Sequence, residues 1–267
     1  GCKKMIKMKD VYESICCKSI RKIMYISDSF VAISGTGFII KFQEKFYFCC
    51  LYHCMSNEGK FEKNKLDGLS ILYKTYLEID PKTISESNVA NYVLFPNFEQ
   101  FTKEFCSSKI DDDLMLDEEF IPIEIIGENK LIPCGYLDFD NKYWRKYLFS
   151  EKEPIEDEIL LVCGFPFSDN EIDYTDDGKI KKVSHQVHIY AGKCKKDDVG
   201  FFVEKEDKNV LFDCNGVSGG IVMRMIDGHS EWVGIAVRAN NDIIRFIPYY
   251  LVAKSIIKNI LDRNKQV

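Results

Sequence analysis

One run of nine residues constrains this chain more than any other stretch: residues 212–220 read Phe-Asp-Cys-Asn-Gly-Val-Ser-Gly-Gly. Its serine, Ser218, has a glycine two positions before it and two glycines directly after it. Glycine tolerates positive φ and lets another stretch of backbone come close. A loop of this kind can aim two amide N–H groups at one point beside a hydroxyl, which stabilises a developing oxyanion. The run predicts a reactive serine; the alternative is a tight glycine-rich turn between two strands.

Two other segments flank this run. Upstream, residues 34–40 read Ser-Gly-Thr-Gly-Phe-Ile-Ile, and residues 46–54 form an apolar stretch that ends in His53 and Cys54. Downstream, residues 231–237 read Glu-Trp-Val-Gly-Ile-Ala-Val. In their order and approximate spacing these segments resemble the trypsin-like serine proteases of the chymotrypsin fold, from about residue 20 onward.

The resemblance implies a serine endopeptidase that hydrolyses a peptide or protein substrate through an acyl-enzyme. In this interpretation Ser218 is the nucleophile, His53 is its general base, and the N–H groups of Gly216 and Ser218 form the oxyanion hole. A serine hydroxyl is a poor nucleophile and needs a base within hydrogen-bond reach. Among the four histidines of the chain, His53 has the context that the family gives to this base.

The acid that completes a Ser-His-Asp triad is less well marked in the sequence. In the family it precedes a short apolar strand, and Asp113, followed by Leu-Met-Leu, offers that pattern. Asp112 is the next choice and Asp138 the third. The alternative interpretation of residues 109–117 is a solvated acidic loop.

The resemblance also implies where a substrate would lie. The pocket wall would include Phe212, Asp213 and Cys214, and substrate backbone would pair with the strand at Val237, Arg238 and Ala239. Asp213 suggests a preference for a basic side chain before the cleaved bond. Val217 stands where secreted members often carry an aspartate that captures a newly cut N-terminus. Regulation is therefore expected from a protein partner, a neighbouring domain or the long excursion at 80–113, and not from N-terminal trimming.

Two rival interpretations compete with this one. The spacing of Gly216, Ser218 and Gly220 also matches the nucleophile elbow of α/β-hydrolases, but that fold needs its acid and then its histidine after the serine. Only His229 follows, with no room for a helix between. The second rival is a catalytically inactive protease-like module, which binds a peptide or protein in the cleft that corresponds to the active site of the proteases. It stays open because the residues just before His53, including Tyr52, are bulky where the family has small ones.

Short apolar runs separated by Gly, Asp and Asn predict a mostly β chain. With the resemblance, the expectation is a single peptidase domain of two six-stranded antiparallel β-barrels, with an N-terminal helical segment and a C-terminal helix. The expected parts are an N-terminal barrel with a long insertion at 20–137, a connection at 138–158, a C-terminal barrel at 159–248 and a helix at 249–263. That helix would place five apolar residues close to one face: Leu251, Ile256, Ile257, Ile260 and Leu261.

Composition excludes several classes of protein. With 46% apolar residues among 267, the chain is globular and can bury a sizeable core. A net charge of −6 argues against nucleic-acid binding. No stretch approaches the ~20 apolar residues needed to cross a bilayer, so no membrane association is expected.

Eleven cysteines, an odd number, include the adjacent pairs at 16–17 and 49–50. In the family the cysteine after the histidine is bridged to one about sixteen residues earlier, where this chain has Phe38. These features predict reduced, mostly buried thiols in a cytoplasmic protein. Zinc at Cys49, Cys50, His53 and Cys54 is the alternative, disfavoured because neighbours in a strand point to opposite faces. No metal or cofactor is expected.

Overall fold

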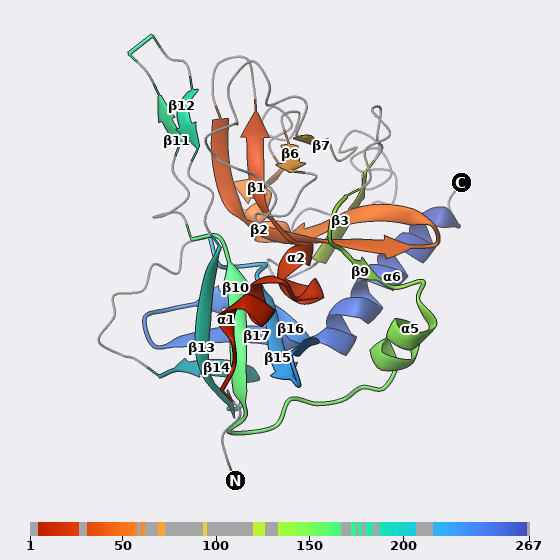
Figure 1. The fold of residues 1–267 in the computed structure, drawn as a ribbon. Coiled ribbons are helices and arrows are strands. Elements are labelled where there is room, and N and C mark those ends of the chain that lie inside the picture. The colour runs from red at the N-terminus through yellow and green to blue at the C-terminus, as the bar shows by residue number, and fades with distance from the viewer. Residues whose placement is uncertain are drawn as a thin grey trace.

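The protein is built from two β units that pack against each other (Figure 1). The structure is a computed structural model. It describes residues 5–26, 31–57, 60–61, 69–72, 93–94, 120–125, 133–166, 172–174, 176–177, 180–183, 187–206 and 216–265.

The N-terminal unit is a seven-stranded sheet in the order β7-β6-β1-β2-β3-β8, with β9 pairing in parallel with β2. The strands are β1 (Ile20–Ile26), β2 (Val31–Phe42), β3 (Lys45–Leu51), β6 (Leu69–Leu72), β7 (Val93–Leu94), β8 (Phe120–Glu124) and β9 (Leu137–Asp138). Two short strands, β4 (Ser56–Asn57) and β5 (Lys60–Phe61), form a separate hairpin. Within the described part of the chain this sheet does not close, whereas the sequence led us to expect a closed six-stranded barrel here.

The C-terminal unit is a closed antiparallel barrel in the order β10-β13-β14-β17-β16-β15. Its six strands are β10 (Ile159–Gly164), β13 (His188–Lys196), β14 (Phe201–Lys205), β15 (Ile221–Ile226), β16 (His229–Ala239) and β17 (Ile243–Pro248). The hairpin of β11 (Ile172–Tyr174) and β12 (Ile180–Val183) lies outside the barrel. Strands such as β14 alternate between buried and partly exposed residues, because successive side chains point to opposite faces.

The described helices are α1 (Met8–Tyr12), α2 (Ile15–Ser19), α5 (Lys142–Leu148) and α6 (Tyr249–Asn264), with a 3₁₀ turn, η1 (Tyr52–Cys54). The C-terminal helix expected from the sequence is α6. Of the five residues expected on its apolar face, Ile256 and Ile260 are buried and Ile257 and Leu261 pack partly buried against the core, whereas Leu251 is 48% exposed. The other buried residues of the helix are Tyr249, Val252 and Ala253. Over the residues with described positions, no helix has the length and apolarity to cross a membrane.

Helices at each end of the described chain pack on the β unit that is distant in sequence. α2 contacts β2, β9, β15 and β16 and lies where the sheet meets the barrel (Figure 1). α6 covers β8, where Asn259 Nδ2 donates to Phe120 O at 3.3 Å and Arg263 donates to Pro122 O at 2.7 Å. Each helical segment therefore connects the two units.

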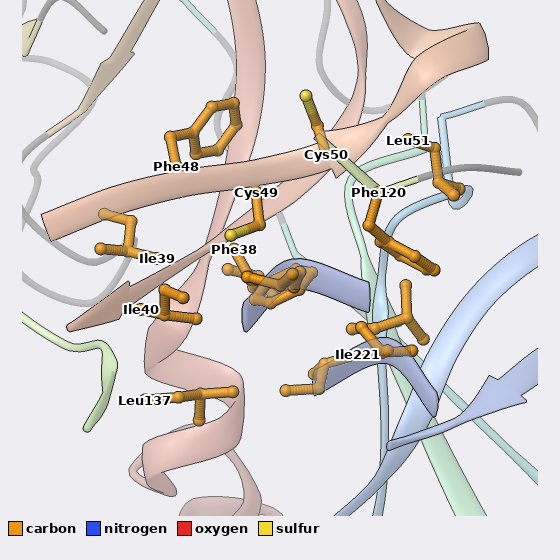
Figure 2. Close-up of a cluster of buried hydrophobic side chains, with 14 of the residues drawn as sticks. Phe38, Ile39, Ile40, Phe48, Cys49, Cys50, Leu51, Phe120, Leu137 and Ile221 are labelled. Carbon is orange, nitrogen blue, oxygen red and sulfur yellow. The ribbon is translucent and has the colours of Figure 1, made fainter. Parts of the chain in front are cut away.

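The buried apolar residues form two clusters: one spans the sheet and part of the barrel, and the other consists of barrel residues together with Val217. Figure 2 shows Phe38 and Phe120 of the sheet close to Ile221 of β15, and all three are buried in one cluster. The Trp232 ring of β16 lies 6.0 Å from the Phe38 ring, centroid to centroid, and makes a hydrogen bond to Gly234 O. This shared core fixes the sheet relative to the barrel, and so fixes segments of both at the seam between them.

A buried ion-pair network ties the connection before β10 to the barrel. Arg224 on β15 binds both carboxylate oxygens of Glu158, at 2.8 and 2.7 Å, and Glu231 at 3.0 Å. The side chain of Arg224 is only 7% exposed. Because the guanidinium lies between two carboxylates, its removal leaves the mostly buried Glu158 without this partner and leaves Glu231 with Lys152, at 3.1 Å.

We therefore expect Arg224→Met to lower the free energy of unfolding by about 2–3 kcal/mol. Urea denaturation at neutral pH measures this loss. The control is Arg245→Met, which breaks the more exposed pair with Asp197 and is expected to cost less than about 1 kcal/mol. Equal losses in the two variants would contradict the structural importance given to the buried network.

Candidate active site

The candidate site lies at the seam where β2, η1 and residues 216–220 meet. His53 is in η1, directly after the buried strand β3, and is partly exposed. Ser218 is in the turn that precedes β15 and is also partly exposed, whereas its neighbours Val217 and Gly219 are buried. Thus the sequence-predicted nucleophile and base are both on segments that reach this seam.

The Ser218 turn, residues 216–220, needs its glycines for two reasons. Gly216 and Gly219 have φ of +92° and +88°, values that side chains with a Cβ rarely adopt. A Cβ on Gly219 would also overlap the carbonyl oxygen of Thr36 on β2. The glycines therefore let the turn press directly against the backbone of the sheet.

Hydrogen bonds fasten the Ser218 turn to its surroundings. Thr36 N donates to Ser218 O at 3.2 Å, and Thr36 Oγ1 donates to Gly216 O at 2.6 Å. Gly220 N donates to Val217 O at 2.8 Å. Hence three consecutive carbonyl oxygens, those of residues 216 to 218, accept hydrogen bonds from the protein.

These carbonyls orient the amide groups of the turn. In a trans peptide the N–H points opposite to the C=O of the preceding residue, so Ser218 N–H points away from Gly220. Gly219 N–H is used by Ala236 O at 2.7 Å. Within the described residues the N–H groups of Gly216 and Ser218 have no acceptor.

The Ser218 hydroxyl donates to Val237 O at 3.2 Å. Cys54, the residue after His53, places its Sγ 3.8 Å from Ser218 O, so η1 borders the Ser218 turn. A Cβ on Gly35 would lie 3.0 Å from Cys54 Sγ. β2 approaches η1 at Gly35, so Gly35 is the residue that faces Cys54. Phe38, which stands where the family has the bridging cysteine, is not.

Of the three acids considered, the structure describes only Asp138. It pairs with Lys41, which in turn pairs with Phe46 on β3, while His53 follows the opposite end of that strand. Five strand residues from Phe46 to Leu51 span about 17 Å, so Asp138 is out of reach of His53. Asp112 and Asp113 lie outside the described residues and stay candidates.

The expected substrate-binding residues are described in part. Phe212, Asp213 and Cys214 lie outside the described residues. Val237 is buried, Arg238 is exposed and Ala239 is partly exposed, at the end of β16. A bulge separates Ala236 from Arg238, which pairs with Arg245 of β17, and this bulge directs Val237 O toward Ser218.

Sequence reasoning missed Thr36. Its hydroxyl donates to Gly216 O and accepts from Phe165 N at 3.0 Å, so it joins β2 to the barrel beside Ser218. The available signal was its position between Gly35 and Gly37, since a polar residue between two glycines often marks a close backbone approach.

The cysteines around the site are free thiols. Eight are described, and all but Cys134 are buried. Burial raises the pKa of Cys54 to about 12, so its thiol stays protonated at neutral pH. Figure 2 shows the side chains of Cys49 and Cys50 on opposite faces of β3, and in the described part of the chain no three His, Cys, Asp or Glu side chains are arranged to hold a metal ion.

Comparison with known proteins gives a structural likeness and no sequence relative. No protein-family model and no curated protein matches the chain. Among solved structures 71 chains match, one of them from the crystal structure of a thermostable serine protease, AL20, from an extremophilic microorganism. That protein and this chain are 11% identical, over 89% of this chain and 94% of the other, with a TM-score of 0.47.

Proposed function

We propose that this chain is a serine endopeptidase of the trypsin-like kind, with Ser218 as nucleophile and His53 as general base. The observation that carries the proposal is the Ser218 turn, which combines a partly exposed hydroxyl with the amide N–H groups of Gly216 and Ser218, for which the described residues offer no acceptor, next to η1. The seam between sheet and barrel would be the cleft, with the N-terminal sheet in place of the first barrel of the double-barrel proteases.

In the proposed reaction, His53 takes the proton of Ser218 as the hydroxyl oxygen bonds to the carbonyl carbon of a peptide. The carbonyl oxygen becomes an oxyanion, which Gly216 N–H and Ser218 N–H stabilise; one such donor is typically worth ~2.7–4 kcal/mol in the transition state. The imidazolium returns the proton to the leaving amine, and water then hydrolyses the acyl-enzyme by the same steps.

One change must precede this reaction. Ser218 Oγ donates its proton to Val237 O, and a serine whose proton is taken by His53 must give up that bond. Rotation about χ1 moves the hydroxyl between staggered positions. In this proposal substrate binding at the cleft favours the rotated form, and a partner protein that docks there can regulate it.

Active-site labelling tests the proposal. A fluorophosphonate probe is expected to react with wild-type protein at Ser218, identified by peptide mass spectrometry. Ser218→Ala should abolish labelling, and His53→Ala should slow it by about 10⁴-fold, because the serine loses its base. Ser230→Ala, which alters a serine on β16 outside the turn, should label like the wild type.

A folded wild-type protein that never labels, with or without candidate peptides, would favour the second function. That function is an inactive module that binds a peptide in the same cleft. The hydrogen bond between Ser218 and Val237 O is the observation that favours it, because it occupies the hydroxyl proton.

A further inference from the structure

Thr36 of the N-terminal sheet binds the Ser218 turn through two hydrogen bonds. It lies in the middle of β2 and is completely buried. Its backbone N–H binds Ser218 O, and its hydroxyl binds Gly216 O. One side chain and its own amide thus fix the carbonyls on both sides of Val217.

The direction of each hydrogen bond at the hydroxyl is determined by its partners. Phe165 N can only donate, so Thr36 Oγ1 accepts that bond at 3.0 Å. Gly216 O can only accept, so Thr36 Oγ1 donates its single proton to that oxygen, at 2.6 Å. The hydroxyl is thereby a fixed bridge between the end of β10 and the turn that carries the nucleophile.

The turn also depends on packing below it. Val217 is completely buried in the barrel core, and a Cβ on Gly164 would lie 3.2 Å from Val217 Cα. Val217 anchors the turn on the barrel side, and Thr36 anchors it on the sheet side. The backbone from Gly216 to Ser218 is therefore restrained on both sides.

We propose that Thr36 is a positioning residue, which holds the Ser218 turn against β2 in the conformation that the amide N–H groups of Gly216 and Ser218 need in order to bind an oxyanion. An effect of Thr36 on catalysis rests on the proposed function, whereas its effect on the conformation of the turn does not. Thr36 itself lies behind the turn and touches neither the Ser218 hydroxyl nor an incoming substrate. Loss of its hydroxyl removes the hydrogen bonds that it makes with Gly216 O and Phe165 N in the buried seam, and the turn is expected to shift away from β2.

Two substitutions separate the hydroxyl from the shape of the side chain. Thr36→Val keeps the shape and removes the hydroxyl, while Thr36→Ser keeps the hydroxyl and removes a methyl group. The control is Val203→Ala, which truncates a buried residue on β14, the strand farthest from β15 in the barrel order.

Amide hydrogen exchange measures the turn directly, whether or not the protein is an enzyme. In Thr36→Val the amides of Gly219, Gly220 and Phe165 should exchange at least about tenfold faster than in the wild type, while β13 is unchanged. Fluorophosphonate labelling of Ser218 should be about tenfold to a hundredfold slower. Thr36→Ser should stay within about threefold of the wild type in both measurements.

Exchange in Thr36→Val that rises no more at the turn than in Val203→Ala would overturn the proposal, as would a Thr36→Ser variant that behaves like Thr36→Val. If the wild type never labels, the proposed endopeptidase fails, and hydrogen exchange alone decides whether Thr36 positions the turn. Faster exchange with unchanged labelling would overturn the catalytic meaning given to Thr36.

Discussion

Replacing Gly219 with alanine is expected to detach the Ser218 turn from β2 and to lower the free energy of unfolding by more than about 4 kcal/mol. The new Cβ would overlap Thr36 O, which belongs to a backbone fixed in the middle of a sheet and cannot move aside. The positive φ of +88° adds strain for any residue other than glycine. Urea denaturation measures the loss, and labelling by a fluorophosphonate should disappear.

Gly228→Ala is the matched control for this prediction. Gly228 has a φ of +83°, close to that of Gly219, but the nearest atom to its Cβ would be Asp10 Oδ2 at 3.7 Å. Only the backbone strain remains there, at about 1–2 kcal/mol. A Gly219→Ala protein as stable as Gly228→Ala, or one that labels normally, would show that the turn does not depend on close contact with β2.

The stability of the protein is expected to rise with pH because of Lys22, a residue of β1 that is only 1% exposed. Burial lowers the pKa of this amine to about 7 from an ordinary value of 10.5. Between these values the unfolded chain binds one more proton than the folded protein, so the free energy of unfolding increases with pH. From pH 7 to pH 9 the increase due to Lys22 is about 2–3 kcal/mol.

The measurement compares wild type with Lys22→Met by urea denaturation at several pH values in this range. The difference between the two isolates Lys22, since the buried thiols contribute in the opposite direction as the pH approaches and passes 9, the ordinary pKa of a thiol: burial raises the pKa of Cys16 to about 12, for example. Lys9→Met, on an exposed lysine, should follow the wild type. Parallel pH profiles for wild type and Lys22→Met would mean that Lys22 is charged in the folded protein.

Lys22 also bears on the site. It pairs with Thr36 in the register of β1 and β2, and directly opposed residues of antiparallel strands have their side chains on the same face. That face is the one that holds the Ser218 turn. A positive charge that forms there at low pH is therefore expected to loosen the same seam.

Much of the fold could be predicted from local pattern. The apolar runs give the strands of the barrel, and the apolar periodicity after Pro248 gives α6. The hairpin between β2 and β3 also has a local signal, since polar residues between two apolar runs indicate a turn, and Gln43 and Glu44 form this turn with positive φ. The sequence does not reveal what stabilises that turn: Asp140 accepts from both of their N–H groups, at 2.7 and 2.9 Å, across almost a hundred residues.

Some residues of the site likewise have a local signal in the sequence, and others do not. Ser218 could be singled out because the glycines around it are a local signal, and His53 because its position relative to two strands is also local. Asp138 could be set aside only when the parallel pairing of β9 with β2 placed it at the far end of the hairpin. Thr36 was missed because its role depends on Phe165 and Gly216, partners that only the folded chain brings together.

The reciprocal packing of the helices has a consequence for biosynthesis. Carbonyl groups of β8 in the N-terminal sheet are capped by Asn259 and Arg263 of α6, which leave the ribosome more than a hundred residues later. The first half of the chain therefore lacks these two side-chain donors until residues 259 and 263 have left the ribosome. Separate expression of the two halves should then yield fragments that become stable only when mixed.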